Sequence, residues 1–213
     1  MTTVAPTVRP PRVPKAEQSR RTRELLVQTG IRCLAEYGYS QTTLLLIANE
    51  AGVSRGPRHY HFRDKNDLMA DIAAALPRRV TPEIRARLER LTDPHERFAA
   101  VIDVALEGHT GHHHFAAMEL LMAARNDPEL AAAIGPHLDE AEAATDSWWM
   151  EYMAGLDLPA DELLALRHVA VACLRGLALD HILHQDRAAH ARAGEMFRAI
   201  FIATTNRART GSS

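Results

Sequence analysis

The chain has 213 residues, of which 46% are hydrophobic and only 5% aromatic. Alanine and leucine recur throughout and favour helices, so we expect an all-α protein. Its two cysteines, Cys33 and Cys173, show no Cys-x-x-Cys spacing and give no support for a disulfide framework or a thiolate metal site; we expect buried, reduced thiols. No apolar run reaches the length of a membrane span, and the first residues contain no signal-peptide centre. We therefore expect a cytoplasmic protein with no membrane partner.

Charge is divided unevenly along the chain. Residues 1–65 carry 11 Lys and Arg against 5 Asp and Glu, a balance of +6, whereas residues 66–213 carry 14 against 22, a balance of −8. A basic first third is typical of a module that faces a polyanion, which would repel the acidic remainder. An uneven but fully solvated surface would give the same balance.

The chain begins with a segment that lacks helical periodicity. Residues 1–14 contain four prolines, and we expect them to form a disordered arm. Apolar residues then recur with helical spacing over residues 16–37, which predicts the first helix. Gly38 can end that helix in a left-handed conformation.

Two short helices are predicted next. The second helix should begin near Thr42 or Thr43, either of which can act as the N-cap, and end at Gly52. Ser54 can cap a third helix over about residues 55–61. Its proline lies in the first turn, where the backbone amides have no partner within the helix, so the proline forfeits no helical hydrogen bond.

Helix-opening and helix-breaking residues divide the rest of the chain regularly. Asp64 can cap a fourth helix over residues 65–91, which Pro77 and Pro82 should kink or split. Asp-Pro pairs and glycines mark the following boundaries. The remaining helices are predicted over residues 94–107, 112–125, 128–154, 159–185 and 187–207.

The second and third predicted helices form a helix-turn-helix pattern around Ala51-Gly52-Val53. The third helix would enter the DNA major groove, led by its N-terminal residues. Arginine can pair with guanine through two hydrogen bonds, and histidine can bond to bases or phosphates, so Arg55, Arg58 and His59 are candidate base readers. Hydroxyl and ammonium groups nearby could hold phosphates. The candidate DNA-binding residues are Thr42, Thr43, Ser54, Arg55, Gly56, Pro57, Arg58, His59, Tyr60, His61 and Lys65.

These residues lie in a stretch that resembles a known domain. The stretch GYSQTTLLLIANEAGVSRGPRHYHFRDKNDL, residues 38–68, resembles the DNA-binding domain of TetR-family transcriptional regulators. The shared pattern combines a glycine-tyrosine pair, two threonines, Ile-Ala, Ala-Gly-Val-Ser, a His-Phe ending and a following lysine, and the resemblance covers about residues 20–70. The stretch MELLMAARNDPELAAAI, residues 118–134, resembles the regulatory domain of a subset of the same family.

The sequence departs from the family pattern at two places. Arg58 and His59 stand where the family usually has leucine and tyrosine, so Arg58 either adds a DNA contact or lies along the protein surface. Thr29-Gly30 replaces two alanines in the first helix. Glycine in a helix interior costs about 1 kcal/mol relative to alanine, and close packing of another helix would compensate.

The resemblance implies a domain division and a homodimer. It implies an arm at 1–14, a three-helix DNA-binding domain at 15–64, a helical regulatory and dimerisation domain at 65–207 and a flexible tail at 208–213. The last two helices would form the interface with a second copy. Small residues among large apolar ones in residues 169–183 would allow close approach of a partner helix, although packing within one monomer would produce the same pattern.

A ligand cavity is predicted between two helices of the regulatory half. One helix offers a phenylalanine and two methionines, and the next offers a tryptophan and a tyrosine, which suit an adaptable pocket. The same stripes would also fit a solid core. Arg175 could meet an anionic ligand or pair with a carboxylate such as Asp180. The candidate ligand-binding residues are Phe115, Met118, Met122, Trp148, Tyr152 and Arg175.

The stretch HTGHHH, residues 109–114, invites a metal-site interpretation. His109 with His112 or His113 could converge on a metal ion if the loop folded back. Adjacent histidines point in different directions on a helix, and no cysteine or carboxylate with ligand spacing accompanies them. We therefore predict no metal ligands and no cofactor here, and we expect His181 and His184 at exposed positions on the edge of the dimer.

The functional prediction is a DNA-binding transcriptional regulator. The resemblance implies a repressor released from a palindromic operator by a small, largely apolar ligand, with the helix over 65–91 as the lever between the two domains. The alternative is an activator, or a ligand-independent DNA-binding protein of the same fold. An all-α enzyme such as a di-iron protein is disfavoured, because the sequence contains no Glu-x-x-His, no His-Glu-x-x-His, no glycine-rich phosphate loop and no Gly-x-Ser-x-Gly.

Overall fold

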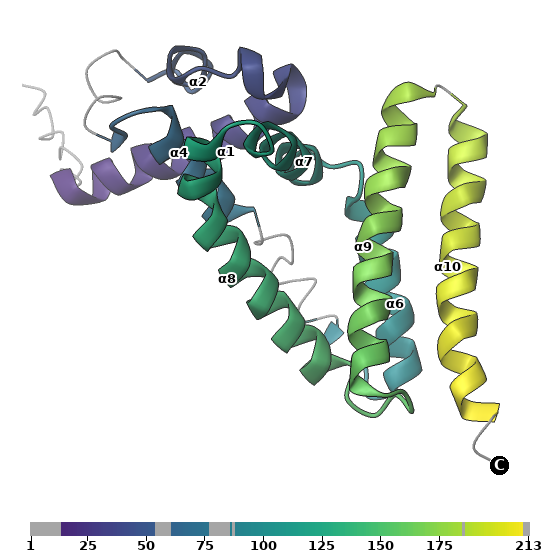
Figure 1. Ribbon diagram of the computed structural model, residues 1–213. Helices are drawn as coiled ribbons and strands as arrows, with labels where there is room; N and C mark the ends of the chain where they lie inside the picture. Colours follow the sequence, from purple (N-terminus) through teal and green to yellow (C-terminus); the bar gives the residue numbers. More distant parts are fainter. Residues whose placement is uncertain (1–13, 54–60, 77–85, 87, 185, 211–213) are drawn as a thin grey trace, which may run out of the picture.

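The computed structural model describes residues 14–53, 61–76, 86, 88–184 and 186–210. Within these ranges the chain forms helices and no strand, which confirms the all-α prediction. The helices in Figure 1 are α1 (Lys15–Gln41), α2 (Leu44–Glu50), α4 (Lys65–Ala75), α6 (Pro94–Gly108), α7 (His112–Ala124), α8 (Pro128–Tyr152), α9 (Ala160–Leu183) and α10 (Arg187–Thr210).

Side-chain caps start several helices where the sequence predicts them. The carboxylates of Asp64, Asp93 and Asp127 accept hydrogen bonds from backbone amides in the first turns of α4, α6 and α8. The side chain of Thr43 accepts from the amide of Leu46 at 3.1 Å and caps α2. Of the two candidate threonines, the N-cap is therefore Thr43.

Helix ends agree with the sequence less uniformly. Gly38, at φ 74°, interrupts α1 where the first helix was predicted to stop, but helical backbone continues to Gln41 beyond the kink. α4 ends at Ala75, so a continuous helix over 65–91 is not observed, and Pro77 and Pro82 lie outside the described residues. The five later helices match their predicted ranges closely, except that α10 continues to Thr210.

The first hydrophobic core joins the N-terminal helices to the regulatory helices. Phe62, which the sequence places in the core, is only 3% exposed. α1 packs closely against α4 at Gly30, because a Cβ atom there would lie 2.5 Å from Ile72 Cδ1. This confirms the close packing expected to compensate for a mid-helix glycine. The other helices contribute Leu26, Ile31 and Leu34 from α1, Ile47 from α2, Leu68 and Met69 from α4, Leu120 from α7, and Leu130 and Ile134 from α8.

A second core lies among α6, α9, α10 and the C-terminal end of α8. The ring of Phe98 meets the ring of Trp149 edge-on, with centroids 5.9 Å apart. Trp149 Nε1 donates a hydrogen bond to the Leu163 carbonyl at 2.9 Å, which satisfies the one polar atom of this buried side chain. α8 thus begins in the first core and ends in the second, as its diagonal course in Figure 1 shows.

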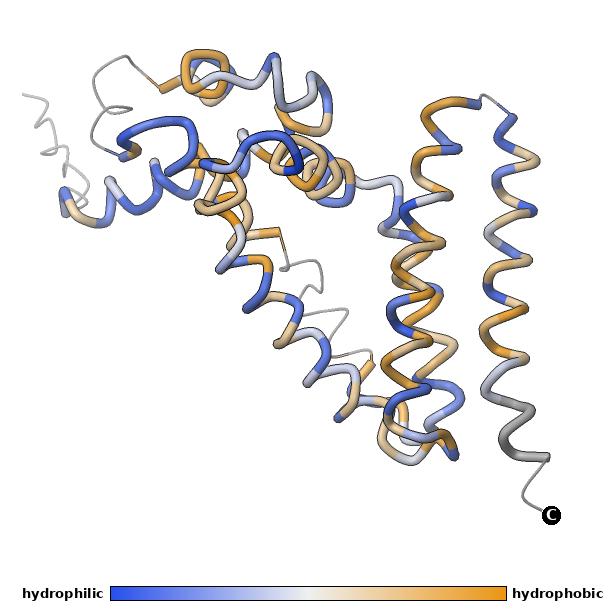
Figure 2. The backbone as a smooth tube through the Cα atoms, viewed as in Figure 1, coloured by the Kyte–Doolittle hydropathy of each residue, from blue (hydrophilic) through white to orange (hydrophobic). Residues whose placement is uncertain are grey.

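Apolar residues also remain on the surface of the second bundle. Figure 2 shows hydrophobic residues along both α9 and α10. Cys33 is buried as expected, but Cys173 is exposed on α9, which corrects the prediction of two buried thiols. None of the described helices combines the length and apolar character that a bilayer crossing would require.

The kink at Gly38 gives a direct test of this fold. Gly38 has φ 74° and ψ 169°, a backbone region almost closed to other residues, and an added Cβ would lie 3.2 Å from Glu119 Oε2. We expect Gly38→Ala to lower the free energy of unfolding by about 1–3 kcal/mol, measured by urea denaturation. Gly108→Ala is the matched control, because an added Cβ at the last residue of α6 meets nothing within 4 Å. It should be neutral or stabilising by up to about 1 kcal/mol, and equal loss in both variants would contradict the assignment of strain to Gly38.

Candidate DNA-binding face and ligand cavity

The first helix and the turn of the helix-turn-helix unit are formed as predicted. Ile47 and Ala48 bury α2 against the first core. After α2 the chain reverses at Gly52, whose φ is 65°, and the Val53 amide donates to the Ala48 carbonyl at 2.9 Å. The predicted reading segment follows this turn directly. Its candidate residues Ser54, Arg55, Gly56, Pro57, Arg58, His59 and Tyr60 lie outside the described residues.

The two adjacent threonines are in different environments. Thr42 is fully buried, and its hydroxyl donates to the Gly38 carbonyl at 2.7 Å. Thr43 is exposed at the N-terminus of α2, where its hydroxyl and the helix end can meet an anion. The expectation that both threonines reach phosphates is therefore corrected: Thr42 closes the turn, and Thr43 is the threonine that a phosphate can reach.

Polar contacts at Tyr39 join the DNA-binding helices to α7. The Tyr39 amide donates to Glu119 Oε2 at 2.8 Å, and its carbonyl accepts from Lys65 Nζ at 2.7 Å. The same Nζ lies 3.6 Å from the centroid of the Tyr39 ring. Burial lowers the pKa of Lys65, and the charge of Asp127 opposes that effect. One donor of the ammonium is used on Tyr39, which leaves others for a phosphate.

His61 lies beside an arginine that links α1 to α4. Arg23 donates to both carboxylate oxygens of Asp71, at 2.6 and 2.9 Å, and to the His61 carbonyl at 2.6 Å. Its guanidinium also lies 4.6 Å from the centroid of the Phe62 ring. Burial and the charge of Arg23 lower the pKa of His61, so its imidazole is neutral at pH 7. Any phosphate contact by His61 would use a neutral N–H group.

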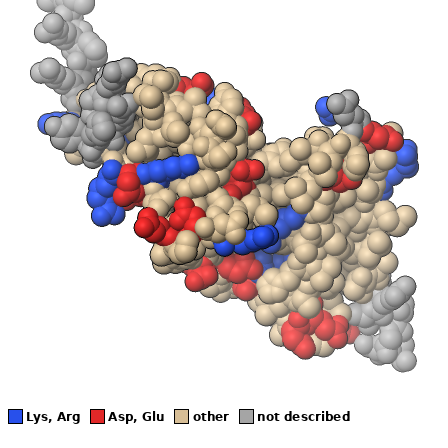
Figure 3. Space-filling model, turned by 45° about the horizontal axis from the view of Figure 1, so that its top comes forward, with Lys and Arg blue, Asp and Glu red and all other residues tan. Residues whose placement is uncertain are grey.

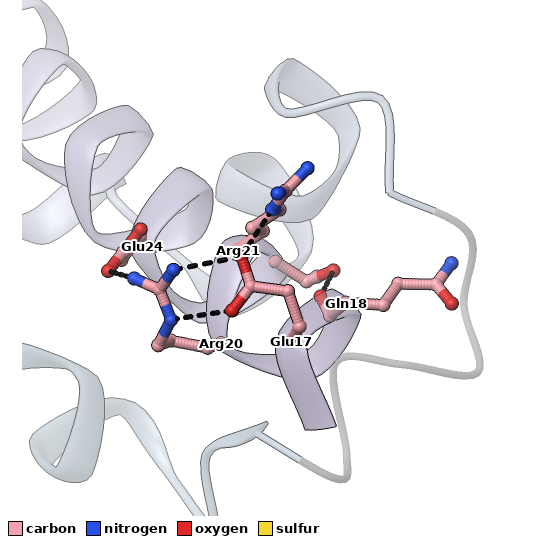
Figure 4. A network of polar contacts seen from close by, with 6 residues as sticks. Glu17, Gln18, Arg20, Arg21 and Glu24 are labelled. Carbon is pink, nitrogen blue, oxygen red and sulfur yellow. Dashed lines mark hydrogen bonds and ion pairs between the residues drawn. The ribbon is translucent and has the colours of Figure 1, made fainter. Parts of the chain in front are cut away.

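Basic side chains at the start of α1 are paired with acidic ones. Figure 4 shows Arg20 between Glu17 and Glu24, and Arg21 directed to Glu17. Hydrogen bonds from Arg21 and then Arg20 lower the pKa of Glu17. Figure 3 accordingly shows blue and red side chains side by side on the N-terminal helices. This part of the predicted basic excess is therefore locally neutralised.

The larger of the two described cavities lies among α6, α7, α8 and α9 and has a volume of about 430 Å³. Aliphatic side chains supply most of its lining, which suits an apolar guest. Glu107 and His114 are the acidic and imidazole groups in its wall, and Trp148 supplies an indole. The lining residues are Leu88, Val101, Val104, Ala105, Glu107, Gly108, His114, Trp148, Val171 and Leu174.

A smaller cavity of about 290 Å³ shares Trp148 with the first. The Trp148 ring stacks on Tyr152, with centroids 5.0 Å apart and 11° between the planes. The Tyr152 carbonyl accepts a hydrogen bond from Arg97, which also donates to two other backbone carbonyls. The carboxylates of Glu89 and Glu151 complete the polar part of this wall.

The N-terminal part of the chain matches a known protein family. The family described as "Bacterial regulatory proteins, tetR family" matches residues 26–72, which contain α2 and the turn described above. This part of the chain matches the TetR family, as the sequence resemblance predicted. It is 25% identical over 178 residues to the HTH-type transcriptional regulator CymR of Pseudomonas putida, covering 84% of this chain and 88% of CymR.

Two solved structures show the same fold at low sequence identity. A transcriptional regulator from Rhodococcus sp. Rha1 is 21% identical, covers 87% of this chain and 96% of its own, and has a TM-score of 0.66. FadR from Bacillus subtilis, solved in complex with stearoyl-CoA, is 16% identical, covers 84% of this chain and 97% of its own, and has a TM-score of 0.61. These relatives are transcriptional regulators, in agreement with the prediction that the chain is not an enzyme.

The structure brings together only part of the predicted ligand-binding set. Trp148 lines both cavities, and Tyr152 lines the smaller one. The predicted α7 residues do not belong to either described lining: Phe115 and Met118 are half-buried, and Met122 is 62% exposed. Arg175 is exposed on α9 and also lies outside both linings.

Most of the cavity residues that sequence reasoning missed lie on α6 and α9; Leu88 and, on α7, His114 are the others. Val101, Val104 and Ala105 line one side, and Val171 and Leu174 line the other. Aliphatic residues at helical spacing look the same in a sequence whether they face a core or a cavity. Whether such residues line a cavity or fill a core depends on the distance between the two helices, which the sequence does not give.

Proposed function

We propose that this TetR-family regulator is a homodimeric repressor. It binds a palindromic operator and is released by a small, largely apolar ligand held among α6, α8 and α9. Residues 15–64 would read DNA in the cytoplasm, and residues 65–207 would bind the ligand and the second copy. The observation that carries the proposal is the turn at Gly52 and Val53, which completes the first half of a helix-turn-helix unit and leads directly into Arg55 and Arg58.

The homodimer is supported by the exposed apolar face of the last two helices. Val169 on α9 is 52% exposed, and Met196 and Ile200 on α10 are 61% and 55% exposed. At the end of α9, Ile182 and Leu183 are 60% and 72% exposed. Large apolar side chains exposed on two neighbouring helices are what a helical interface with a second copy would bury. Pairing two copies there would present two reading segments to half-sites about 34–36 Å apart or at a wider spacing.

A coupling route from the cavity to the DNA-binding helices runs along α8. Trp148 lines the cavity near one end of α8, whereas Leu130 and Ile134 pack into the first core near the other end. α8 contacts α4 closely, and Lys65 at the start of α4 holds the Tyr39 turn. A ligand that prefers one position of α8 would therefore shift the population of DNA-binding geometries. This route replaces the long 65–91 lever expected from the sequence.

The lining supports a ligand that is mostly hydrocarbon. FadR of Bacillus subtilis, which shares this fold, was solved in complex with stearoyl-CoA, so the fold can accommodate an acyl chain. In this chain the volume of about 430 Å³ and the aliphatic wall suit a small apolar molecule. Glu107 and His114 offer it polar contacts at the wall.

Operator recognition can be tested through the two arginines of the reading segment. A duplex selected from a random library with the wild-type protein should bind Arg55→Ala about 5- to 150-fold more weakly, with relaxed preference at the contacted base, because a bidentate base contact contributes about 1–3 kcal/mol. The same measurement on Arg58→Ala shows where Arg58 lies. Weaker binding with relaxed base preference indicates a base contact, and unchanged binding indicates a position along the protein surface. Arg90→Ala removes the same charge from the regulatory half and should leave binding unchanged. Equal wild-type affinity for all duplexes would contradict sequence-specific recognition.

The dimer face can be tested with a matched pair of exposed apolar residues. Ile200→Asp places a charge on the α10 face, and we expect a monomer in sedimentation analysis with greatly weakened operator binding. Met122→Asp makes the same kind of change at a 62% exposed residue on α7 and should remain a dimer. Circular dichroism checks that both variants are folded. A wild-type protein that sediments as a monomer at the concentrations that bind DNA would argue against this interface.

Ligand-dependent release can be tested by filling the cavity. Apolar acyl and aromatic compounds that raise the melting temperature should also dissociate the wild-type protein from its operator. Ala105→Trp should keep operator binding and lose the response to these compounds, since the indole would occupy the cavity. Ala143→Trp, on the exposed part of α8, should respond like the wild type. Operator binding that is indifferent to every compound would favour a ligand-independent regulator instead.

A further inference from the structure

Three histidines from separate parts of the chain meet where α10 packs against α6 and α9. His109 follows the end of α6 and is 8% exposed, His181 lies on α9, and His190 lies on α10. The rings of His109 and His190 stack 16° from parallel, with their Nε2 atoms 3.0 Å apart. The centroid of the His181 ring lies 4.9 Å from that of His190. Histidines clustered in this way are candidate ligands for a metal ion.

The hydrogen bonds define the proton positions in the neutral pair. His109 Nδ1 contacts the Leu106 carbonyl, which can only accept, so Nδ1 of His109 carries the proton and its Nε2 keeps a lone pair. His190 Nε2 must then donate to that lone pair. This leaves His190 Nδ1 as an acceptor, and it is buried with no hydrogen-bond partner among the described residues.

We propose that His109, His181 and His190 form a binding site for a first-row transition-metal dication such as Zn²⁺. A metal-bound imidazole ordinarily donates its other N–H to a carbonyl or carboxylate, which is the arrangement of His109 and Leu106. Two nitrogens on a tetrahedral zinc ion lie about 3.3 Å apart, given Zn–N distances of about 2.0–2.1 Å. The observed 3.0 Å therefore requires only a small separation of the two rings.

Metal binding at this site needs no change in the net charge of the rings. The ion takes the place of the proton shared by the two Nε2 atoms, and the His190 proton moves to Nδ1, so both imidazoles stay neutral. Rotation of the His181 side chain supplies the third ligand. Burial, with His109 and His181, lowers the pKa of His190, and Asp180 opposes that shift.

A second cluster of possible metal ligands, Glu142, Asp146 and His168, already has its negative charge neutralised by an arginine. One ligand atom from each residue lies within 4.8 Å of the other two, but the buried guanidinium of Arg167 pairs with both carboxylates. The guanidinium therefore occupies the place beside the two carboxylates where a metal ion would have to bind. The sequence analysis considered His109 only together with the nearby histidines of HTGHHH and predicted no metal ligands there. In the fold, the histidines that gather around His109 come from α9 and α10.

Metal uptake by the tag-free, chelator-treated full chain tests the proposal. In calorimetric titration with Zn²⁺ alone we expect one ion per chain and a raised melting temperature. His190→Gln should abolish both effects, and His181→Gln should weaken uptake at least 10-fold. His112→Gln, an exposed histidine of the same HTGHHH stretch, and the double variant Glu142→Gln, Asp146→Asn should bind like the wild type.

Two further measurements keep the test decisive. Circular dichroism shows whether each variant is folded, and the visible absorption of Co²⁺ in place of Zn²⁺ reports a tetrahedral nitrogen site directly. Absence of uptake by the wild-type chain would overturn the proposal. Uptake that survives His190→Gln, or that is lost in His112→Gln, would assign the ion to other histidines and overturn it as well.

Discussion

The packing of α1 and α4 against α7 and α8 is the constraint on which the molecule depends. Ile72 fits against Gly30 so closely that even one methyl group on the glycine would require a shift, and Leu120 and Ile134 extend the same core into the regulatory helices. Helices that share a close-packed core cannot move independently without opening voids. The position of the DNA-binding helices is therefore tied to the regulatory half by apolar contact.

Polar groups fix the orientation at this junction. The backbone of Tyr39 is held on one side by Glu119 of α7 and on the other by Lys65 of α4, next to the strained kink at Gly38. Directional hydrogen bonds of this kind specify one geometry, which the apolar core alone does not. The turn that they hold leads into α2, so any movement of α4 or α7 reaches the helix-turn-helix unit at its first residue. α8 supplies the link to the cavity, because it is buried in both cores.

The number of charged residues in a segment predicted the DNA-binding face less well than the positions of those residues in the structure. The excess of basic residues before residue 66 predicted a polyanion-binding module, and residues 26–72 match a family of bacterial regulatory proteins. The structure shows that Arg20, Arg21 and Arg23 pair with carboxylates. Their partners include Asp71, which is 48 residues from Arg23, so counting charges in a segment could not separate structural arginines from those available to DNA.

The sequence by itself determined most of the described helices, their capping residues and the turn after α2, because caps, proline positions and tight turns act over a few neighbouring residues. Only the tertiary structure decided that Thr42 is buried while Thr43 is exposed, that α6 and α9 enclose a cavity, and that α8 enters two cores. It also placed His109 against His190, 81 residues away. Such outcomes depend on the distances between packed helices, which local periodicity does not encode.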